Sequence, residues 1–271
     1  MNELYEAIEK LNVGREKEDI IVDEEKRPFS WCVDMTESSR IMIAGCSGSG
    51  KSVALKDIIY TLMATSPDEN QFVFVDLKRI ELRVFKAAPH TIAYVTEPDE
   101  VVNALKKVLD IIDERFRDME MTGKLVSDEP NIWVVIDEYA DLVTVGDKRI
   151  EKAVQRIAQI GRASRVGIIL CTQRPTSEIV AGAISANIPV KLACRTVTKQ
   201  DSRNILGVSG AESLPDYGYG IMQVNGRNKI VKIPFLEQRE LNSRVVAWIK
   251  DDIAFNGEQK CTKKRLNLFS R

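Results

Sequence analysis

The segment from residue 45 to residue 52 is rich in glycine and ends in a lysine and a serine. It matches the phosphate-loop pattern G-x-x-x-x-G-K-[ST] at every position. Glycines let the backbone curl so that its N–H groups point at phosphate oxygens, while the lysine reaches the β- and γ-phosphates. We expect ATP to be bound by Gly45, Cys46, Ser47, Gly48, Ser49, Gly50, Lys51 and Ser52, with the Ser52 hydroxyl ligating Mg²⁺.

The flanks of this segment agree with a phosphate loop. Ile41–Ala44 is a short apolar run typical of a buried strand, and the residues from 53 to 65 favour a helix. A strand that enters a glycine-rich turn and opens a helix places the positive end of the helix dipole at the phosphates. This context disfavours the alternative, which is a chance glycine-rich turn.

A second acidic motif follows the apolar run Val134–Ile136. Asp137 ends this predicted strand, where a carboxylate can hold Mg²⁺, and the adjacent Glu138 can polarise an attacking water as a general base. The alternative is an acidic pair that merely ends a strand and starts a helix. The Glu directly after the Asp suggests an ATPase with an additional strand between the two motif strands, for which the run 72–76 is the neighbour in sequence order.

A third candidate follows the predicted strand 168–172. We expect Gln173 to face the γ-phosphate and to sense its hydrolysis, because a polar side chain at that strand end would lie beside the phosphate loop. The alternative is a strand-ending turn before Pro175.

Strands and helices alternate along the chain. Apolar runs separated by helices predict a mainly parallel sheet covered on both faces, so we expect a RecA-like α/β P-loop NTPase fold. Two strands joined around Asn225-Gly226 read as a hairpin. Further strands are predicted at 72–76, 132–136, 168–172, 190–193, 221–224 and 229–233, and helices at 97–121, 148–163 and 241–253.

Three regions are expected along the 271 residues: an N-terminal extension (1–40) packed on the motor, the ATPase motor itself (41–255) and a flexible basic tail (256–271). The extension becomes strand-like at Ile20–Val22 and again at Trp31–Val33. The tail is polar and carries several lysines and arginines, a composition that favours disorder.

Composition narrows the function classes. The chain is 44% hydrophobic and 29% charged, with a formal net charge of −1. It therefore lacks the overall positive charge that would by itself indicate nucleic-acid binding. No apolar run approaches the roughly 18 residues of a membrane helix. The five scattered cysteines show no metal spacing, which favours a reduced, cytoplasmic protein. No catalytic triad can be built around His90, the single histidine.

Beyond these motifs, the stretch from about Met42 to Ile249 resembles the motor domain of the FtsK/SpoIIIE family of DNA translocases. Order and spacing agree across about three quarters of the chain. The resemblance rests on Ala44–Ser52, Val75–Leu82, Ile136–Leu142, Gly161–Ala163, Thr172–Pro175, Ala186–Pro189, Asp201–Leu206 and Gly210–Leu214.

By this resemblance the protein would be a ring-forming, hexameric ATP-driven motor that translocates double-stranded DNA in element transfer, chromosome handling or viral packaging. With no membrane segment of its own, it would meet a membrane or a capsid only as a partner. Two alternatives stay open. One is a secretion-type motor that acts on protein substrates, and the other is a nucleotide-gated scaffold with slow hydrolysis.

Ring ATPases complete their site with an arginine from the next subunit. The candidates are Arg115, Arg162 and Arg203. Arg115 is favoured because the corresponding helix end carries this arginine in some relatives, and Arg162 is next. Pore contacts to DNA phosphates would use basic side chains without reading bases. The candidates are Lys191, Arg195, Lys199, Arg203, Arg227 and Lys229.

Overall fold

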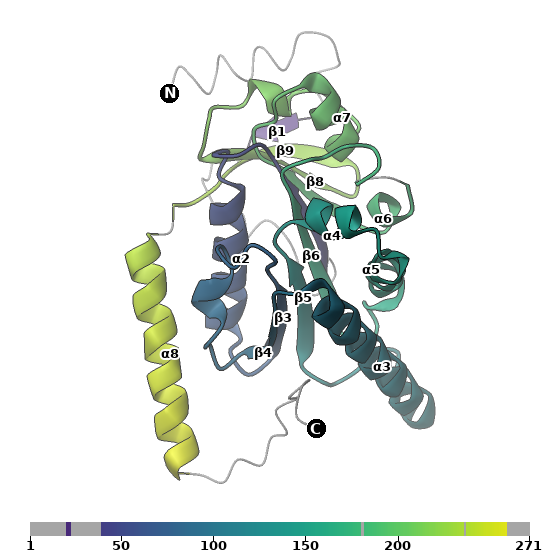
Figure 1. Ribbon diagram of the computed structural model, residues 1–271, viewed down its shortest axis with the longest axis vertical. Coiled ribbons are helices and arrows are strands. Elements are labelled where there is room, and N and C mark those ends of the chain that lie inside the picture. The colour runs from purple at the N-terminus through teal and green to yellow at the C-terminus, as the bar shows by residue number, and fades with distance from the viewer. Residues whose placement is uncertain (1–19, 23–38, 180–181, 236, 259–271) are drawn as a thin grey trace.

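The computed structural model describes residues 20–22, 39–179, 182–235 and 237–258 (Figure 1). These residues form one nine-stranded sheet in the order β1-β9-β8-β7-β2-β6-β5-β3-β4. The strands are β1 (Ile20–Val22), β2 (Arg40–Ala44), β3 (Asn70–Val75), β4 (Thr91–Val95), β5 (Asn131–Ile136), β6 (Val166–Thr172), β7 (Val190–Ala193), β8 (Tyr219–Val224) and β9 (Arg227–Lys232).

Neighbouring strands run parallel except at β7–β8 and β8–β9. The predicted hairpin is confirmed: β8 and β9 are joined at Asn225 and Gly226, whose φ angles of 50° and 82° are those of a tight hairpin turn. The mostly parallel sheet confirms the expected α/β fold.

Strand β6 lies between β2 and β5, so the strand expected between the two motif strands is present. It comes from the region after the acidic motif, because β3, the neighbour suggested by sequence order, pairs with β5 on its far side. The phosphate-loop strand therefore adjoins the strand that ends in Thr172, and Asp137 lies one strand further away.

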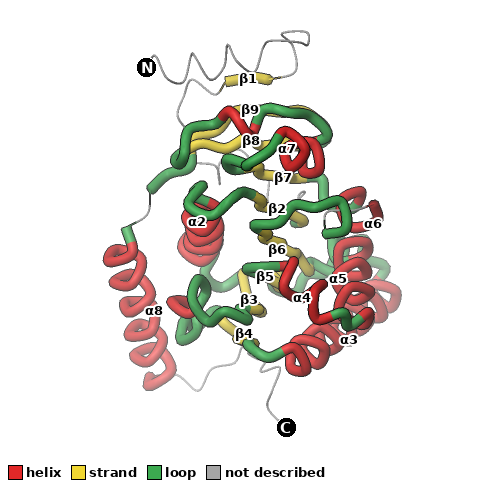
Figure 2. The backbone as a smooth tube through the Cα atoms, turned by 45° about the horizontal axis from the view of Figure 1, so that its top comes forward, coloured by secondary structure: helices red, strands yellow, loops and turns green. Residues whose placement is uncertain are grey.

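Helices cover both faces of the sheet (Figures 1 and 2). Alternate strand residues such as Phe72 and Phe74 pack with α2 and α8 on one face, and Val73 and Val75 pack with α3, α4 and α5 on the other. Helix α7 covers the β7–β9 end of this second face. The helices are α2 (Lys51–Thr65), α3 (Pro98–Thr122), α4 (Tyr139–Val145), α5 (Lys148–Ile160), α6 (Gly182–Ala186), α7 (Lys199–Leu206) and α8 (Gln238–Glu258).

Short 3₁₀ turns at Arg83–Phe85 and Ala211–Ser213 complete the described structure. Part of the predicted N-terminal extension joins the sheet, because β1 pairs with β9. Trp31–Val33 and residues 259–271 of the predicted tail lie outside the described residues. Helix α5 ends three residues earlier than expected, with Gly161 as its C-cap. The chain then turns into β6, because Val166 N donates to the Gly161 carbonyl at 2.8 Å and Arg165 adopts a positive φ of 56°.

Candidate nucleotide-binding site

The phosphate loop connects β2 to α2 at the carboxyl edge of the sheet (Figure 1). Gly48 and Gly50 have φ angles of 77° and 91°, in the left-handed region that favours glycine, and Gly50 is the N-cap of α2. The loop is hydrogen-bonded to the segment that follows β7, because the N–H of Cys46 donates to the Arg195 carbonyl at 2.9 Å. This backbone is shaped to direct N–H groups and a helix N-terminus at an anion.

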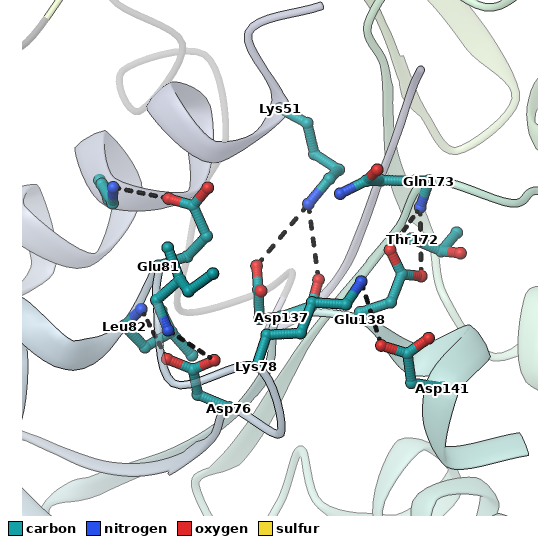
Figure 3. A network of polar contacts seen from close by, with 12 residues as sticks. Lys51, Asp76, Lys78, Glu81, Leu82, Asp137, Glu138, Asp141, Thr172 and Gln173 are labelled. Atoms are coloured by element: carbon teal, nitrogen blue, oxygen red, sulfur yellow. Dashed lines mark hydrogen bonds and ion pairs between the residues drawn. The ribbon is translucent and has the colours of Figure 1, made fainter. Parts of the chain in front are cut away.

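Lys51 points from the first turn of α2 toward the end of β5 (Figure 3). Its ammonium lies 3.5 Å from the Asp137 carbonyl oxygen and 3.7 Å from Asp137 Oδ1, and its side chain is 4% exposed. Burial disfavours its charge, but the Cys171 sulfur and the carboxylates of Asp137, Glu138 and Glu81 outweigh burial and raise the pKa of Lys51. A buried, charged ammonium with long contacts is available to a phosphate.

Asp137 is the first residue after β5 and is buried. Burial raises its pKa to about 6 against the opposing effect of Lys51, and nearby Asp76, Glu81 and Glu138 add to the rise. Within the described residues, Asp137 Oδ1 has no hydrogen-bond partner. An unsatisfied buried carboxylate oxygen is costly unless a further positive group binds there.

The pair of Ser52 and Asp137 fits Mg²⁺. No group of three or more His, Cys, Asp or Glu side chains in the described part of the chain could hold an ion alone. Mg²⁺ usually binds one or two protein oxygens and completes its shell with substrate phosphates and water. The orphaned Asp137 oxygen opposite the phosphate loop supplies such a ligand.

Glu138 is buried beside Asp137 and reaches across to β6 (Figure 3). The backbone N–H of Gln173 donates to its Oε1 at 3.2 Å and to its Oε2 at 3.0 Å. Its Oε1 also accepts from Ala140 N at 3.4 Å, which caps α4. The carboxylate is thus oriented by two elements and lies near the ammonium of Lys51.

Gln173 is exposed at the end of β6, adjacent to Glu138, because β6 lies between β2 and β5. The neighbouring Thr172 hydroxyl accepts from Arg174 N at 3.1 Å and stabilises the turn. The structure therefore brings together Lys51, Asp137, Glu138 and Gln173, whose roles in catalysis stay predictions.

Sequence reasoning missed Glu81, which lies beside the phosphate loop (Figure 3). Its carboxylate is 2.7 Å from Lys56 Nζ and is hydrogen-bonded to the Ser52 side chain. Burial opposes ionisation of Glu81, but these contacts and the charge of Lys51 outweigh it and lower the pKa. Glu81 lies within Val75–Leu82, one of the segments that carry the resemblance, but a single carboxylate in a loop gave no indication of its role.

Asp76 is fully buried and holds the loop that presents Glu81. Its carboxylate accepts from Ile80 N at 3.3 Å, from Leu82 N at 3.1 Å and from the Tyr94 hydroxyl at 2.9 Å. Lys78, in the same loop, pairs with Asp141 of α4 at 3.1 Å. The loop after β3 is therefore held to β4 through Asp76 and to α4 through Lys78.

Arg115 lies in α3 and is 3% exposed. Its guanidinium donates to the carbonyls of Ser164 at 2.7 Å and Pro130 at 2.8 Å, just before β6 and β5 begin. Reaching a neighbouring subunit would require both bonds to break, so the geometry gives Arg115 a structural role and does not support the expected role in trans. Arg162 and Arg203 are exposed, and Arg162 stays a prediction.

The six basic residues expected on DNA do not form one cluster. Lys191 is half-buried on β7 and donates to Ser185 Oγ at 2.8 Å, and burial lowers its pKa. Arg195 lies at the carboxyl edge and pairs with Asp216 at 3.2 Å, whereas Arg227 follows the hairpin turn at the opposite edge. The other three are Lys199, Arg203 and Lys229.

Comparison with known proteins gives a consistent assignment. The FtsK/SpoIIIE family model matches residues 7–130 and 123–177. The DNA translocase FtsK of Bradyrhizobium diazoefficiens is 34% identical over 263 residues and that of Lactococcus lactis strain IL1403 is 36% identical over 241 residues. Each alignment covers 80% of this chain and 32% of the relative, so the chain spans about a third of these relatives.

Solved structures share the fold. The pCW3 conjugation coupling protein TcpA with ATPγS aligns with a TM-score of 0.71 at 23% identity over 79% of this chain and 66% of that one. The cytoplasmic domain of the type VII secretion ATPase EccC from Thermomonospora curvata also gives 0.71, at 22% identity over 88% of this chain and 32% of that one.

None of the helices described here has the length and apolarity that a membrane span requires. The phosphate loop, the acidic strand end and Gln173 lie together at one sheet edge, and all of them fall within the residues that the family model matches. The chain belongs to the FtsK/SpoIIIE family.

Proposed function

We propose that this chain is an ATP-hydrolysing ring motor that moves double-stranded DNA. One observation carries the proposal: the buried Lys51, Asp137 and Glu138 lie around a phosphate loop together with the strand end at Gln173. The FtsK relatives are named DNA translocases, and that substrate is carried over to this chain as part of the proposal.

The phosphates of ATP would lie over the N–H groups of the loop at the start of α2, with Lys51 against the terminal oxygens. Ser52 and Asp137 would hold Mg²⁺, which would supply positive charge to those oxygens. Occupation of the site would give new partners to two buried groups, the Lys51 ammonium, whose contacts are long, and Asp137 Oδ1, which accepts no hydrogen bond from the described residues. Binding of ATP and Mg²⁺ would thus also neutralise the buried charges of Lys51 and Asp137.

Glu138 is the proposed general base. Its carboxylate is oriented by the N–H of Gln173, so the strand end that meets the γ-phosphate and the base that activates water are hydrogen-bonded to each other. Loss of the γ-phosphate would move Gln173 and Glu138 together. This contact is the proposed first step from hydrolysis to movement.

Arg162 is the proposed arginine in trans within the ring. It is exposed in the turn before β6, so its side chain can leave this position without the cost of breaking buried contacts such as those of Arg115. A guanidinium supplied in this way stabilises negative charge in the transition state.

The test is ATP turnover by the full chain with and without linear duplex DNA, with Lys51→Ala as the inactive control. We expect duplex DNA to stimulate turnover, with a stimulation that falls steeply as salt rises, because each phosphate contact releases a counterion. Turnover that DNA leaves unchanged would overturn the DNA motor and favour a motor acting on protein. Absence of turnover in all conditions would favour the scaffold.

A further inference from the structure

Two aromatic side chains stand out by their exposure. The side chains of Tyr217 and Phe235 are 73% and 80% exposed, whereas most aromatic side chains of the described strands and helices are buried or half-buried. They lie in two loops, 214–218 before β8 and 233–235 after β9. Exposed aromatic rings in loops close to a ligand site suit contact with a flat, partly apolar ligand.

Both loops lie at the edge of the sheet that carries the phosphate loop. Strand β9 runs parallel to β7 with β8 antiparallel between them, so β8 begins where β7 and β9 end. The two loops are hydrogen-bonded through Ile233 N and the Gly218 carbonyl at 2.9 Å. A side-chain carbon built on Gly50 would lie 3.8 Å from Gly218 N and 3.9 Å from Ile233 Cδ1, so both loops adjoin the phosphate loop.

The charged groups define the direction of the nucleotide. Lys51, Asp137 and Glu138 lie on the β6–β5 side of the loop, where the terminal phosphate belongs. Strand β2 has β6 as one neighbour and β7 as the other. A nucleotide with its terminal phosphate against β6 and β5 therefore extends past the start of α2 toward the loops beside β7, β8 and β9.

From this geometry we infer that loops 214–218 and 233–235 form the subsite for the nucleobase and ribose, with Tyr217 and Phe235 as its aromatic contacts. The inference rests on the proposed ATP site and adds residues that recognise the other end of the ligand. Aromatic rings hold any base by its flat face, so the subsite adds affinity without strong selection among purines.

The test compares two ligands that share phosphates but differ in the base. Affinities of ATP and of inorganic tripolyphosphate are measured by titration calorimetry on the full chain with Mg²⁺, in a Glu138→Gln background that limits turnover. We expect Tyr217→Ala and Phe235→Ala each to lose about tenfold in ATP affinity and to keep tripolyphosphate affinity. Tyr217→Phe, which retains the ring, should recover most of the loss. Leu125→Ala, at an exposed loop site after α3, is the control.

Unchanged ATP affinity in both alanine variants would overturn the subsite while leaving the phosphate site intact. Equal losses for ATP and tripolyphosphate would also overturn it, because they report damage to the loop itself. A Glu138→Gln parent protein that binds neither ligand would overturn the proposed ATP site, and the subsite with it.

Discussion

Strands β5 and β6 hold buried polar groups at both ends, and the two ends differ in pairing. At the amino ends, the Arg115 guanidinium donates to two carbonyls within 2.8 Å, and Asn70 Oδ1 accepts from Asn131 and from Trp133 Nε1. At the carboxyl ends, the Lys51 ammonium makes contacts of 3.5 and 3.7 Å, and Asp137 Oδ1 accepts no hydrogen bond from the described residues.

This difference separates stability from function on one scaffold. A buried polar group with all its partners holds the fold, whereas one without them costs free energy that a ligand can recover. We therefore interpret the carboxyl ends, with Lys51 and Asp137, as a binding site for phosphate and Mg²⁺. At the amino ends, the hydrogen bonds of Arg115 hold α3 against the sheet. Substitutions at the two ends should have separable effects.

The largest effect is expected at the carboxyl ends. Glu138→Gln keeps the shape of the side chain but removes the charge that activates water, so ATP turnover should fall by roughly 10²–10⁴-fold. ATP affinity and thermal stability should change little, because the amide oxygen can still accept from Gln173 N. Single-turnover hydrolysis, ATP titration and thermal unfolding measure the three quantities. Normal steady-state hydrolysis would place the base elsewhere.

At the amino ends, Arg115→Ala should lower the free energy of unfolding by about 3 kcal/mol, because the buried Ser164 carbonyl and the partly buried Pro130 carbonyl lose their donor and a cavity forms. The matched control, Arg162→Ala, removes an exposed guanidinium and should change stability by less than about 0.5 kcal/mol. Urea unfolding measures both.

Subunit mixing then tests which arginine acts in trans. An inactive Arg162→Ala chain and an inactive Lys51→Ala chain should partly restore turnover when mixed, because a mixed ring contains some complete sites. Recovery with Arg115→Ala and none with Arg162→Ala, with assembly confirmed, would reverse the assignment.

The sequence was informative where residues act through local patterns. The phosphate loop, the strand before Asp137 and the Asn225-Gly226 hairpin each have a short-range signature that survives in the structure. Helix α7 also has one, a capping box between Thr198 and Asp201, which went unrecognised. Strand order has no such signature. Only the pairing of strands in the sheet shows that the strand inserted between β2 and β5 is β6 and not β3.

Side-chain partners in the site were harder to foresee. Glu81 reaches Ser52 because Asp76 fixes the loop that carries Glu81. This arrangement brings together three segments, namely the start of α2, the loop after β3 and strand β4, so it depends on the folded chain. Arg115 was favoured as the trans arginine because some relatives carry one at the corresponding helix end, yet in this structure its side chain is buried. The helical pattern of α3 predicts which face of the helix is buried, but not that backbone carbonyls lie opposite Arg115 on that face.

A smaller effect is expected from Glu81→Gln, which keeps size but removes the charge next to Ser52. The Mg²⁺ concentration for half-maximal ATP turnover should rise by about tenfold, as for other groups that orient a metal ligand. Glu240→Gln, in an exposed pair with Arg244 on α8, is the control. An unaltered Mg²⁺ requirement would show that Glu81 acts only through its ion pair with Lys56.

The smallest effect tests whether missing partners alone mark a functional group. Asp57, on α2, is buried, and its Oδ2 has no hydrogen-bond partner among the described residues, although it lies outside the site's acidic cluster. Burial raises its pKa from 3.8 to about 6. The folded state therefore binds this proton more tightly than the unfolded state, so the carboxyl costs stability progressively as pH rises from about 4 to 6 and by a constant amount above.

Asp57→Asn should remove that cost. The change in unfolding free energy should be a gain of about 1 kcal/mol at pH 7, because the buried amide offsets about 2 of the roughly 3 kcal/mol that a two-unit shift costs the carboxyl there. At pH 4.5, where the carboxyl costs only about 1 kcal/mol, the same amide cost should make the variant less stable by about 1 kcal/mol. Urea unfolding of both proteins across this range gives the difference, in which other titrating groups cancel. ATP affinity should not change. A gain independent of pH would remove titration as its cause, whereas a loss of ATP affinity would make Asp57 part of the site and show that poor pairing marks function even outside the strand ends.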